Sequence, residues 1–511
     1  MTSSFTGCGL ILFIKLLLCV VSVRGFAGFP STDACGGSTC ELDLQSESDT
    51  SSAVQLQHNA AKGQRPSSSI NPILRKYSAL TRALKSGSAS KTASKARSHD
   101  DHFQGQLLQA NGQSTEAKGL APLGFRSGTP RIWARAGTPA QGPMNAILDL
   151  GSSDVWFTSP SCKTSDMPET VGGTGCPPYR KAIKTASGTC PSSGTYDPSV
   201  SSTSSSYCSS CLCEAYSAGW ASGGDYSDKL WLGDGPGLDV WMGSITLQQD
   251  TTQALDADGI IGLGFTLVAF VTIPTLTTEM QTKGISYFTL CIPQCEAGNP
   301  GGGTCESSEL GGSYSGFICL GCEAACDVLD GQTDLPWVQS DHVMNVTSTG
   351  YAWWLLSLSS LTVNGNSGPS ELCSAGCFES GAILDSGFAL IALPGACAEN
   401  FMATLQRETG PSCSVSNGQP VQGVPTLVLE CSSLPVTSWP NLNMTLGGVH
   451  LTLAPKYYVQ VNGTGTRGIF QVAQGITELV LGAAFLNAFY TKYNPSEYWV
   501  AFKGVGVNGR R

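Results

Sequence analysis

The chain has 511 residues, of which 41% are hydrophobic and 13% are charged, and its formal net charge at pH 7 is −10. This length is too great for one small core and predicts at least two globular units, each able to bury a core of its own. The low charged fraction and the 61 glycines argue against a charged disordered protein and against a helical bundle, and they favour a β-rich extracellular protein.

The N-terminal segment is typical of a secretion signal. An apolar run extends from Leu10 to Val23 and is interrupted mainly by Lys15. The run is shorter than the roughly 20 residues that a bilayer-spanning helix needs. We therefore predict a signal peptide over residues 1–25, with cleavage near Gly25, and an anchored N-terminal helix is the alternative. No later segment is long and apolar enough to span, so we expect no membrane span in the mature chain.

Residues 26–118 differ in composition from everything that follows. They are rich in Ser, Gln and Ala with little apolar periodicity, and every charged residue between Lys62 and Arg97 is basic. The chain after residue 120 is acidic instead. Charge complementarity predicts a flexible basic propeptide that binds the acidic body. A disordered basic linker or a nucleic-acid-binding arm is the alternative, and we expect no nucleic-acid partner.

The chain contains 21 cysteines, most of them between Cys162 and Cys431. This density predicts disulfide bonds formed in an oxidising compartment. Two clusters have spacings that could hold zinc, namely Cys208-x-x-Cys211-x-Cys213 and Cys319-x-x-Cys322-x-x-x-Cys326. A partner pair with matching His ligands is missing from a chain with only five His, so we expect neither a metal nor another cofactor. Three glycosylation tripeptides fit a secreted glycoprotein and begin at Asn345, Asn443 and Asn462.

From about residue 121 onward, short apolar runs alternate with Gly, Pro, Asn and Ser, a pattern that predicts a mostly β fold. This part of the chain contains an internal repeat. AILDLGSSDVWFTSP at 146–160 is echoed by AILDSGFALIALP at 382–394, and DGIIGLGF at 258–265 is echoed by ELVLGAAFL at 478–486. Each half therefore supplies one apolar strand that ends in Asp-x-Gly.

The repeat places Asp149 and Asp385 directly after apolar strands. A carboxylate in such a place is costly unless its charge is used, and the glycine two residues later allows a tight turn and a close backbone approach. If the two carboxylates meet, they cannot both ionise easily, so one proton is shared between them. Such a pair can activate a water molecule by acid and base catalysis, with no covalent intermediate and no metal.

Several motifs in a fixed order resemble the pepsin-like aspartic protease family, over about residues 120 to 505. A single Asp-x-Gly would carry no weight, but this ordered set is specific. The matching segments are Gly137–Gln141, Asp149–Trp156, Tyr196–Thr203, Ala215–Gly223, Tyr351–Trp353, Leu361–Gly365, Cys373–Cys377, the pair Cys413 and Cys431, and Leu481–Gly482.

The resemblance implies a bilobal β fold with two pseudo-symmetric lobes and a cleft between them. The N-terminal lobe with its flap would span residues 119–335 and the C-terminal lobe residues 336–511. The implied activity is hydrolysis of peptide bonds in proteins at acid pH, with Asp149 and Asp385 as the catalytic residues. The resemblance also implies a monomeric zymogen whose partners are its own propeptide and protein or peptide substrates. Its destination would be the secretory pathway, either the extracellular space or an acidic compartment like a vacuole or lysosome.

The same resemblance implies a substrate-binding set around the two aspartates. Tyr216 would lie on the flap over the cleft with Trp156 as its hydrogen-bond partner, and Ser152 would donate to Asp149. The full set is Gly151, Ser152, Trp156, Tyr216, Ser386 and Gly387.

Two departures from the family pattern bear on activity. The family carries Thr or Ser between Asp and Gly in both motifs, where the hydroxyls brace the two turns against each other, whereas this chain has Leu150 in the first motif and Ser386 in the second. Half of that brace should be absent, at about 0.5–1.5 kcal/mol for each lost hydrogen bond. Phe388 and Ala389 also stand where the family has hydroxyls. We therefore expect Asp385 to be the protonated partner, and the alternative function is an inactive homologue that binds peptides or a protein partner.

Overall fold

The computed structural model describes residues 119–126, 128–165, 186–190, 192–216, 219–233, 235–249, 257–269, 274–292, 316–322, 335–345, 351–365, 368–372, 377–378, 381–422, 424–463, 465–473, 476–504 and 507–508. Internal contacts divide the chain into residues 1–71 and residues 72–511, and every described residue belongs to the second unit. The predicted signal peptide and propeptide lie outside the described residues.

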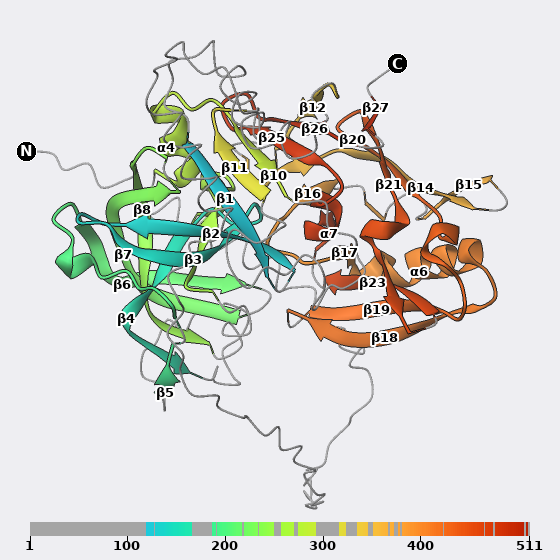
Figure 1. Ribbon diagram of the computed structural model, residues 1–511, viewed down its shortest axis with the longest axis horizontal. Helices are drawn as coiled ribbons and strands as arrows, with labels where there is room; N and C mark the ends of the chain where they lie inside the picture. The colour runs from blue at the N-terminus through green and yellow to red at the C-terminus, as the bar shows by residue number, and fades with distance from the viewer. Residues whose placement is uncertain are drawn as a thin grey trace, which may run out of the picture. The chain divides into compact units, whose positions relative to one another are not determined.

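The largest sheet has 14 strands and contains most of the N-terminal half (Figure 1). Two C-terminal strands, β25 and β26, join its edge beside β10 and β12. In order across the sheet, the strands are β12 (Val338–His342), β26 (Trp499–Lys503), β25 (Tyr490–Asn494), β10 (Phe288–Cys291), β11 (Gly316–Leu320), β1 (Gly119–Arg126), β2 (Thr129–Ala136), β3 (Gln141–Asp149), β9 (Gly259–Gly262), β4 (Val155–Ser165), β8 (Leu238–Gln249), β7 (Gly219–Leu232) and β6 (Ser205–Tyr216), with β5 (Ala186–Thr189) paired to β4.

Two further sheets come from the C-terminal half. The eight-stranded sheet runs β13 (Leu355–Leu356), β16 (Ala382–Leu384), β24 (Leu479–Leu481), β17 (Ile391–Pro394), β23 (Gly465–Ala473), β19 (Val424–Cys431) and β18 (Cys413–Val421), with β22 (Val459–Asn462) paired to β23. The five-stranded sheet runs β15 (Gly368–Glu371), β14 (Leu358–Gly365), β20 (Leu442–Leu446), β21 (Val449–Leu453) and β27 (Val507–Asn508).

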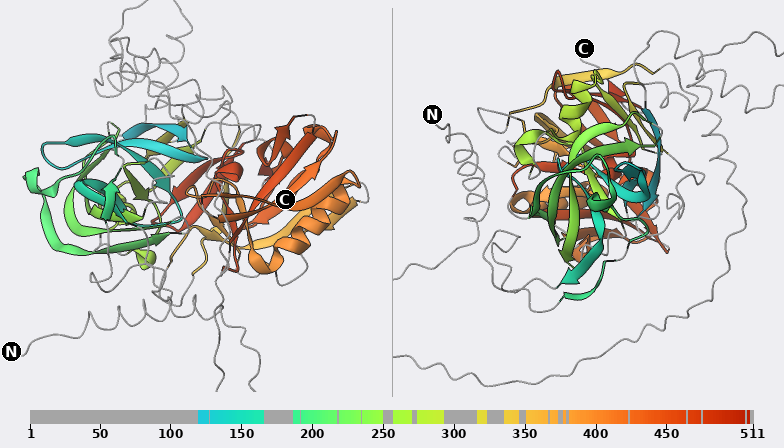
Figure 2. Two further views of the ribbon diagram at one scale, coloured as in Figure 1. Left: turned by 90° about the horizontal axis from the view of Figure 1, so that it is seen from below. Right: turned by 90° about the vertical axis from the view of Figure 1, so that its left-hand side faces the viewer.

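The described residues contain few helices, namely α4 (Leu276–Thr282), α6 (Gly395–Thr409), α7 (Ala483–Leu486) and single 3₁₀ turns at Pro198–Val200, Thr266–Val268, Val436–Ser438 and Pro455–Tyr457. Helix α6 packs against β14, β17, β18 and β19 (Figure 2). It buries Phe401, Met402 and Leu405 at helical spacing. It ends at Thr409 and is capped by Gly410, whose φ of 119° suits glycine. The mostly β, bilobal fold class expected from the sequence is confirmed.

The internal repeat appears as matching strand pairings in the two halves. Strand β3 pairs in parallel with β9, which pairs in antiparallel with β4. In the same way, β16 pairs in parallel with β24, which pairs in antiparallel with β17. The two echoes seen in the sequence are therefore the same structural unit used twice, and each copy ends its first strand at an Asp-x-Gly turn.

Disulfide bonds join Cys162 to Cys190, Cys319 to Cys322 and Cys413 to Cys431, so the expectation of disulfides is confirmed for these cysteines and Cys319 is not a zinc ligand. The resemblance also implies a short disulfide loop between Cys373 and Cys377, but that bridge is not formed, because Cys377 carries a free thiol. Cys373 itself lies outside the described residues. Within the described ranges, no helix is long and apolar enough to cross a membrane.

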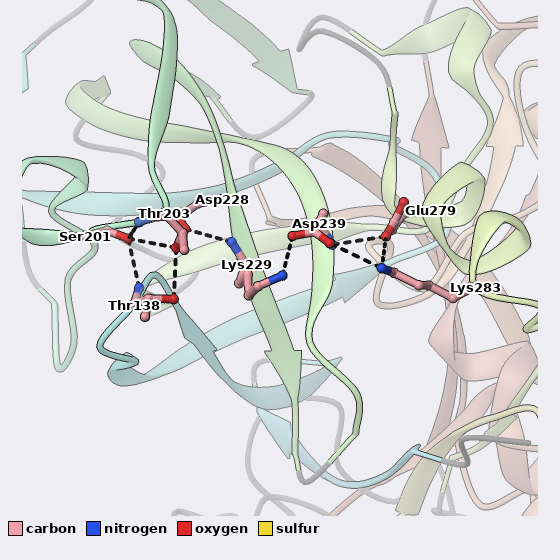
Figure 3. Close-up of polar contacts among 8 residues, drawn as sticks. All are labelled: Thr138, Ser201, Thr203, Asp228, Lys229, Asp239, Glu279 and Lys283. Carbon is pink, nitrogen blue, oxygen red and sulfur yellow. Dashed lines mark hydrogen bonds and ion pairs between the residues drawn. The ribbon is translucent and has the colours of Figure 1, made fainter.

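A chain of polar contacts ties the base of β6, β7 and β8 to α4 (Figure 3). Thr203 donates from Oγ1 to Asp228 Oδ1 over 2.6 Å. On the other side, Lys229 Nζ lies 2.5 Å from Asp239 Oδ1, and Lys283 Nζ lies 3.2 Å from Asp239 Oδ2. The hydrogen bond from Lys229 is the main cause of a lowered pKa at Asp239. The ion pairs are partly exposed and contribute little stability.

Candidate active site

The two aspartates occupy equivalent places in the repeated unit. Asp149 is the last residue of β3 and pairs with Gly262 of β9. Asp385 directly follows β16, and its amide donates to the carbonyl of Leu481 in β24 over 3.2 Å. Because each aspartate stands where a buried strand turns, its side chain leaves the sheet at the same point in each half.

The structure brings the two turns together. A Cβ atom built on Gly151 would collide with the carboxyl group of Asp385, and one built on Gly387 would lie 2.6 Å from Oδ1 of Asp149. Each glycine therefore faces the aspartate of the other half. A side chain at either position would push the turns apart, which gives a physical reason for glycine in both motifs.

Asp149 accepts two hydrogen bonds from its own turn. The amide of Gly151 donates to Oδ1 over 2.9 Å, and Ser152 Oγ donates to Oδ2 over 2.5 Å. The Ser152 contact is the one expected from the sequence. Only 6% of Asp149 is exposed, so these two donors satisfy its carboxyl oxygens in place of water.

Asp385 lies in a different environment. The amide of Gly387 donates to its Oδ1 over 2.8 Å. Burial raises the pKa of Asp385 well above the usual value of an aspartate, and the charge of Asp149 and a hydrogen bond with that carboxyl raise it further. The backbone amides of Gly387 and Phe388 act in the opposite direction. The balance favours the protonated form at Asp385, as the sequence led us to expect.

Half of the brace between the turns is present. Ser386 Oγ donates to the carbonyl oxygen of Leu148 over 2.6 Å and accepts from the amide of Leu150 over 3.0 Å. Ser386 is fully buried, and so is Leu150, whose side chain belongs to the main hydrophobic core. The half that Leu150 cannot supply is thus replaced by apolar packing rather than by another hydroxyl.

Tyr216 and Trp156 are in contact. Trp156 Nε1 donates to the hydroxyl oxygen of Tyr216 over 2.7 Å, and the ring centroids are 6.4 Å apart. Tyr216 ends β6, where it pairs with Gly219 of β7, so it lies at the tip of a long hairpin, and residues 217–218 of that tip are outside the described residues. Burial, followed by the charges of Glu214 and Asp154, raises the pKa of Tyr216. Its phenol therefore stays protonated and its O–H remains a donor.

Two residues at this site were not predicted from the sequence. Gln422, between β18 and β19, and Gln471 of β23 both hydrogen-bond the backbone just after Asp385. A glutamine carries no local signal for such a role. Only the pairing of β19 with β23, which joins segments about 40 residues apart in sequence, brings both amides to the same turn.

Comparison with known proteins agrees with this geometry. The family described as eukaryotic aspartyl protease matches residues 134–290 and 327–504. Pepsin-2B of Gadus morhua is 24% identical over 377 residues, which cover 72% of this chain and 93% of that protein. Cathepsin D of Dictyostelium discoideum is 25% identical over 72% of this chain and 80% of its own length, and an aspartic protease of Phaffia rhodozyma is 25% identical over 80% and 84%. The chain belongs to the eukaryotic aspartyl protease family.

Proposed function

We propose that this protein is an active aspartic endopeptidase that hydrolyses peptide bonds at acid pH, using a water molecule held between Asp149 and Asp385. The observation that carries the proposal is the reciprocal approach of the two Asp-x-Gly turns, in which each glycine faces the opposite carboxyl group. The unequal surroundings of the two aspartates support distinct roles, because Asp149 accepts two donors while the pKa of Asp385 is raised by burial and by Asp149.

In the proposed reaction, the carboxylate of Asp149 takes a proton from the water as its oxygen attacks the peptide carbonyl carbon. The carboxyl group of Asp385 gives its proton to the carbonyl oxygen, so the intermediate is a neutral diol. The carbon–nitrogen bond then breaks as Asp149 returns its proton to the leaving nitrogen and Asp385 recovers one from the diol. The other residues of the set would line this centre and bind the substrate. They are Gly151, Ser152, Trp156, Tyr216, Ser386 and Gly387.

The direction of the Asp385 shift sets the pH dependence. Activity needs one proton on the pair, so it falls as pH rises through the higher apparent pKa of the pair and falls again when both carboxyl groups are protonated. The raised pKa of Asp385 keeps the shared proton in place to a higher pH than an isolated aspartate would allow.

The test is incubation of the purified full chain with a denatured protein at pH ~4, near the ordinary range of carboxyl titration, with and without a pepstatin-type inhibitor. We expect acid-dependent cleavage that the inhibitor abolishes. A fully matured protein that binds peptide but cleaves none of it would instead favour the inactive homologue. The observation behind that alternative is Leu150, which stands where the family carries a hydroxyl.

We also propose that the protein follows the secretory route and is glycosylated. The disulfide bonds support an oxidising compartment. Asn345 and Asn462 are exposed, whereas Asn443 is half-buried in β20 and its Oδ1 accepts from Thr452 Oγ1 over 2.9 Å. We therefore assign glycans to Asn345 and Asn462 and none to Asn443.

For activation, we propose that the basic segment from Lys62 to Arg97 covers the acidic body at neutral pH and leaves on acidification. Opposite charges attract within about 8 Å at physiological salt, and the attraction fades as Asp and Glu titrate near pH ~4. In the family that the chain resembles, a propeptide lysine reaches the catalytic pair. Lys76 beside Tyr77 is the candidate, with Arg75 as the alternative.

The activation prediction is checked by shifting the proform from neutral to acid pH while following its size on gels and its new N-terminus by sequencing. We expect cleavage between Arg97 and Gly119, because β1 begins at Gly119 and is paired on both sides, with β2 and β11. Asp149→Asn should block this cleavage if the protein processes itself. A proform that is fully active at neutral pH with the segment attached would contradict the proposed cover.

A further inference from the structure

The two catalytic turns are held in different ways. In the first turn, Ser152 donates to Asp149 and Ser153 Oγ donates to the carbonyl of Phe265 over 2.5 Å. The equivalent positions of the second turn are Phe388 and Ala389, which have no hydroxyl. Phe388 instead packs against a small apolar cluster formed by Ala392, Ala473, Ile476 and Val480. The second turn therefore needs another source of hydrogen bonds.

Two glutamine amides supply them. Gln422 Oε1 accepts from the amide of Ala389 over 3.1 Å, and its Nε2 donates to the carbonyl of Gly387 over 3.2 Å. Gln471, which is fully buried, accepts from the amide of Leu390 over 3.2 Å and donates to the carbonyl of Val421 over 3.0 Å. The hairpin of β18 and β19 is thereby fastened to the turn that carries Asp385.

We propose that Gln422 is a positioning residue for Asp385. The inference rests on the proposed function, because it assigns Gln422 a part in setting the proton affinity of the pair. Its two hydrogen bonds fall on either side of Phe388, so they fix the backbone of Gly387 and Phe388. The amides of these two residues are the ones that bond Asp385 and lower its pKa.

The hairpin turn offers an independent observation. Val421 pairs with Val424, and Gln422, which directly follows Val421, has a left-handed φ of 53°. This backbone conformation favours Asn or Asp among the residues that carry a side chain, and a glutamine there is strained. Glutamine differs from asparagine by one methylene, which is the reach that the contacts with Gly387 and Ala389 require.

The difference of one methylene between Gln and Asn defines an informative variant. Gln422→Asn suits the turn and is expected to keep or raise the melting temperature, but its amide is too short to reach the Asp385 turn. We expect kcat to fall by about 10-fold to 100-fold with KM little changed, because a small misplacement of a catalytic group is costly. Gln419→Asn is the matched control, since Gln419 is exposed on the same hairpin and should leave kcat unchanged. A normal kcat in Gln422→Asn would overturn the inference, and so would a fall in kcat matched by an equal fall in the control or by a fall in melting temperature.

A second measurement does not depend on activity. Because the pKa of Asp385 is raised in the folded state, its contribution to stability is full at low pH and is lost as pH rises through that pKa. If the amides of Gly387 and Phe388 are held less firmly, the pKa of Asp385 should rise further. The pH-dependent loss of melting temperature should therefore extend to higher pH in Gln422→Asn. The charged group that acts on Asp385 within the described residues is Asp149, so the difference should vanish in an Asp385→Asn background.

These measurements separate the two hypotheses. A wild-type protein that cleaves no peptide while the Asp385-dependent shift is present would refute the proposed activity and retain the positioning role. An active wild-type protein whose Gln422→Asn variant has neither the kcat loss nor the shift would refute the positioning role alone.

Discussion

We expect the replacement of Asp385 by Asn to abolish the proposed peptide hydrolysis and to leave the protein folded. The change removes the acid of the proposed pair while preserving its shape, so we expect kcat to fall by about 10³-fold or more. The stability of Asp385→Asn at neutral pH, in contrast, should not fall. The raised pKa of Asp385 means that its ionisation costs stability as pH rises, and an asparagine cannot ionise. The melting temperature above that pKa should therefore be equal to or higher than that of the wild type.

The measurement pairs a peptide-cleavage assay with thermal unfolding at pH ~4 and pH ~7, around the ordinary titration range of a carboxyl group and above it. Asp149→Asn should be equally inactive, because it removes the proposed base. Asp341→Asn, an exposed position in β12, is the control for the chemical change itself and should keep full activity. Retained cleavage in either active-site variant would remove the pair from the mechanism.

The close approach of the Asp149 and Asp385 turns could be predicted from the sequence because its signal is local. An apolar strand that ends in Asp-x-Gly places a carboxylate where its charge must be satisfied, and the occurrence of two such strands predicts that the two carboxylates meet. The contact of Trp156 with Tyr216 was expected from the resemblance to the pepsin-like family, since the two residues lie far apart in the sequence. For the aspartate turns, by contrast, a few adjacent residues determine which backbone conformation is possible and which side chain must be satisfied.

Other features depend on which distant segments meet, and the sequence does not reveal that. Gln422 looks like an ordinary turn residue until β18 and β19 lie against the Asp385 turn. Leu150 supplies no hydroxyl to the brace, as expected, but its full burial in the main core depends on contacts with distant residues. The pairing of β25 with β10 and of β26 with β12 is likewise a contact between distant segments that no local pattern predicts.

Ser386 is the residue for which the largest loss of stability is expected. Its single hydroxyl bonds both Leu148 and Leu150 across the two turns, and Leu150 has no polar group that could replace it. In Ser386→Ala, a buried carbonyl and a buried amide each lose this partner, and an unsatisfied buried group costs about 1–3 kcal/mol. We therefore expect the free energy of unfolding to fall by about 2–4 kcal/mol, as the sum of two such groups with partial relaxation. Since the same bonds hold the two aspartates in register, kcat should fall as well.

Equilibrium unfolding in urea measures this loss, and two companion variants interpret it. Ser386→Thr keeps the hydroxyl and should stay close to the wild type in stability and kcat. Ser360→Ala removes an exposed hydroxyl that bonds Thr445 over 2.9 Å, and it should cost less than about 1 kcal/mol because water replaces the partner. If Ser386→Ala were as mild as Ser360→Ala, the hydroxyl would not be bracing the turns, and the register of the two aspartates would have to come from the apolar packing of Leu150 alone.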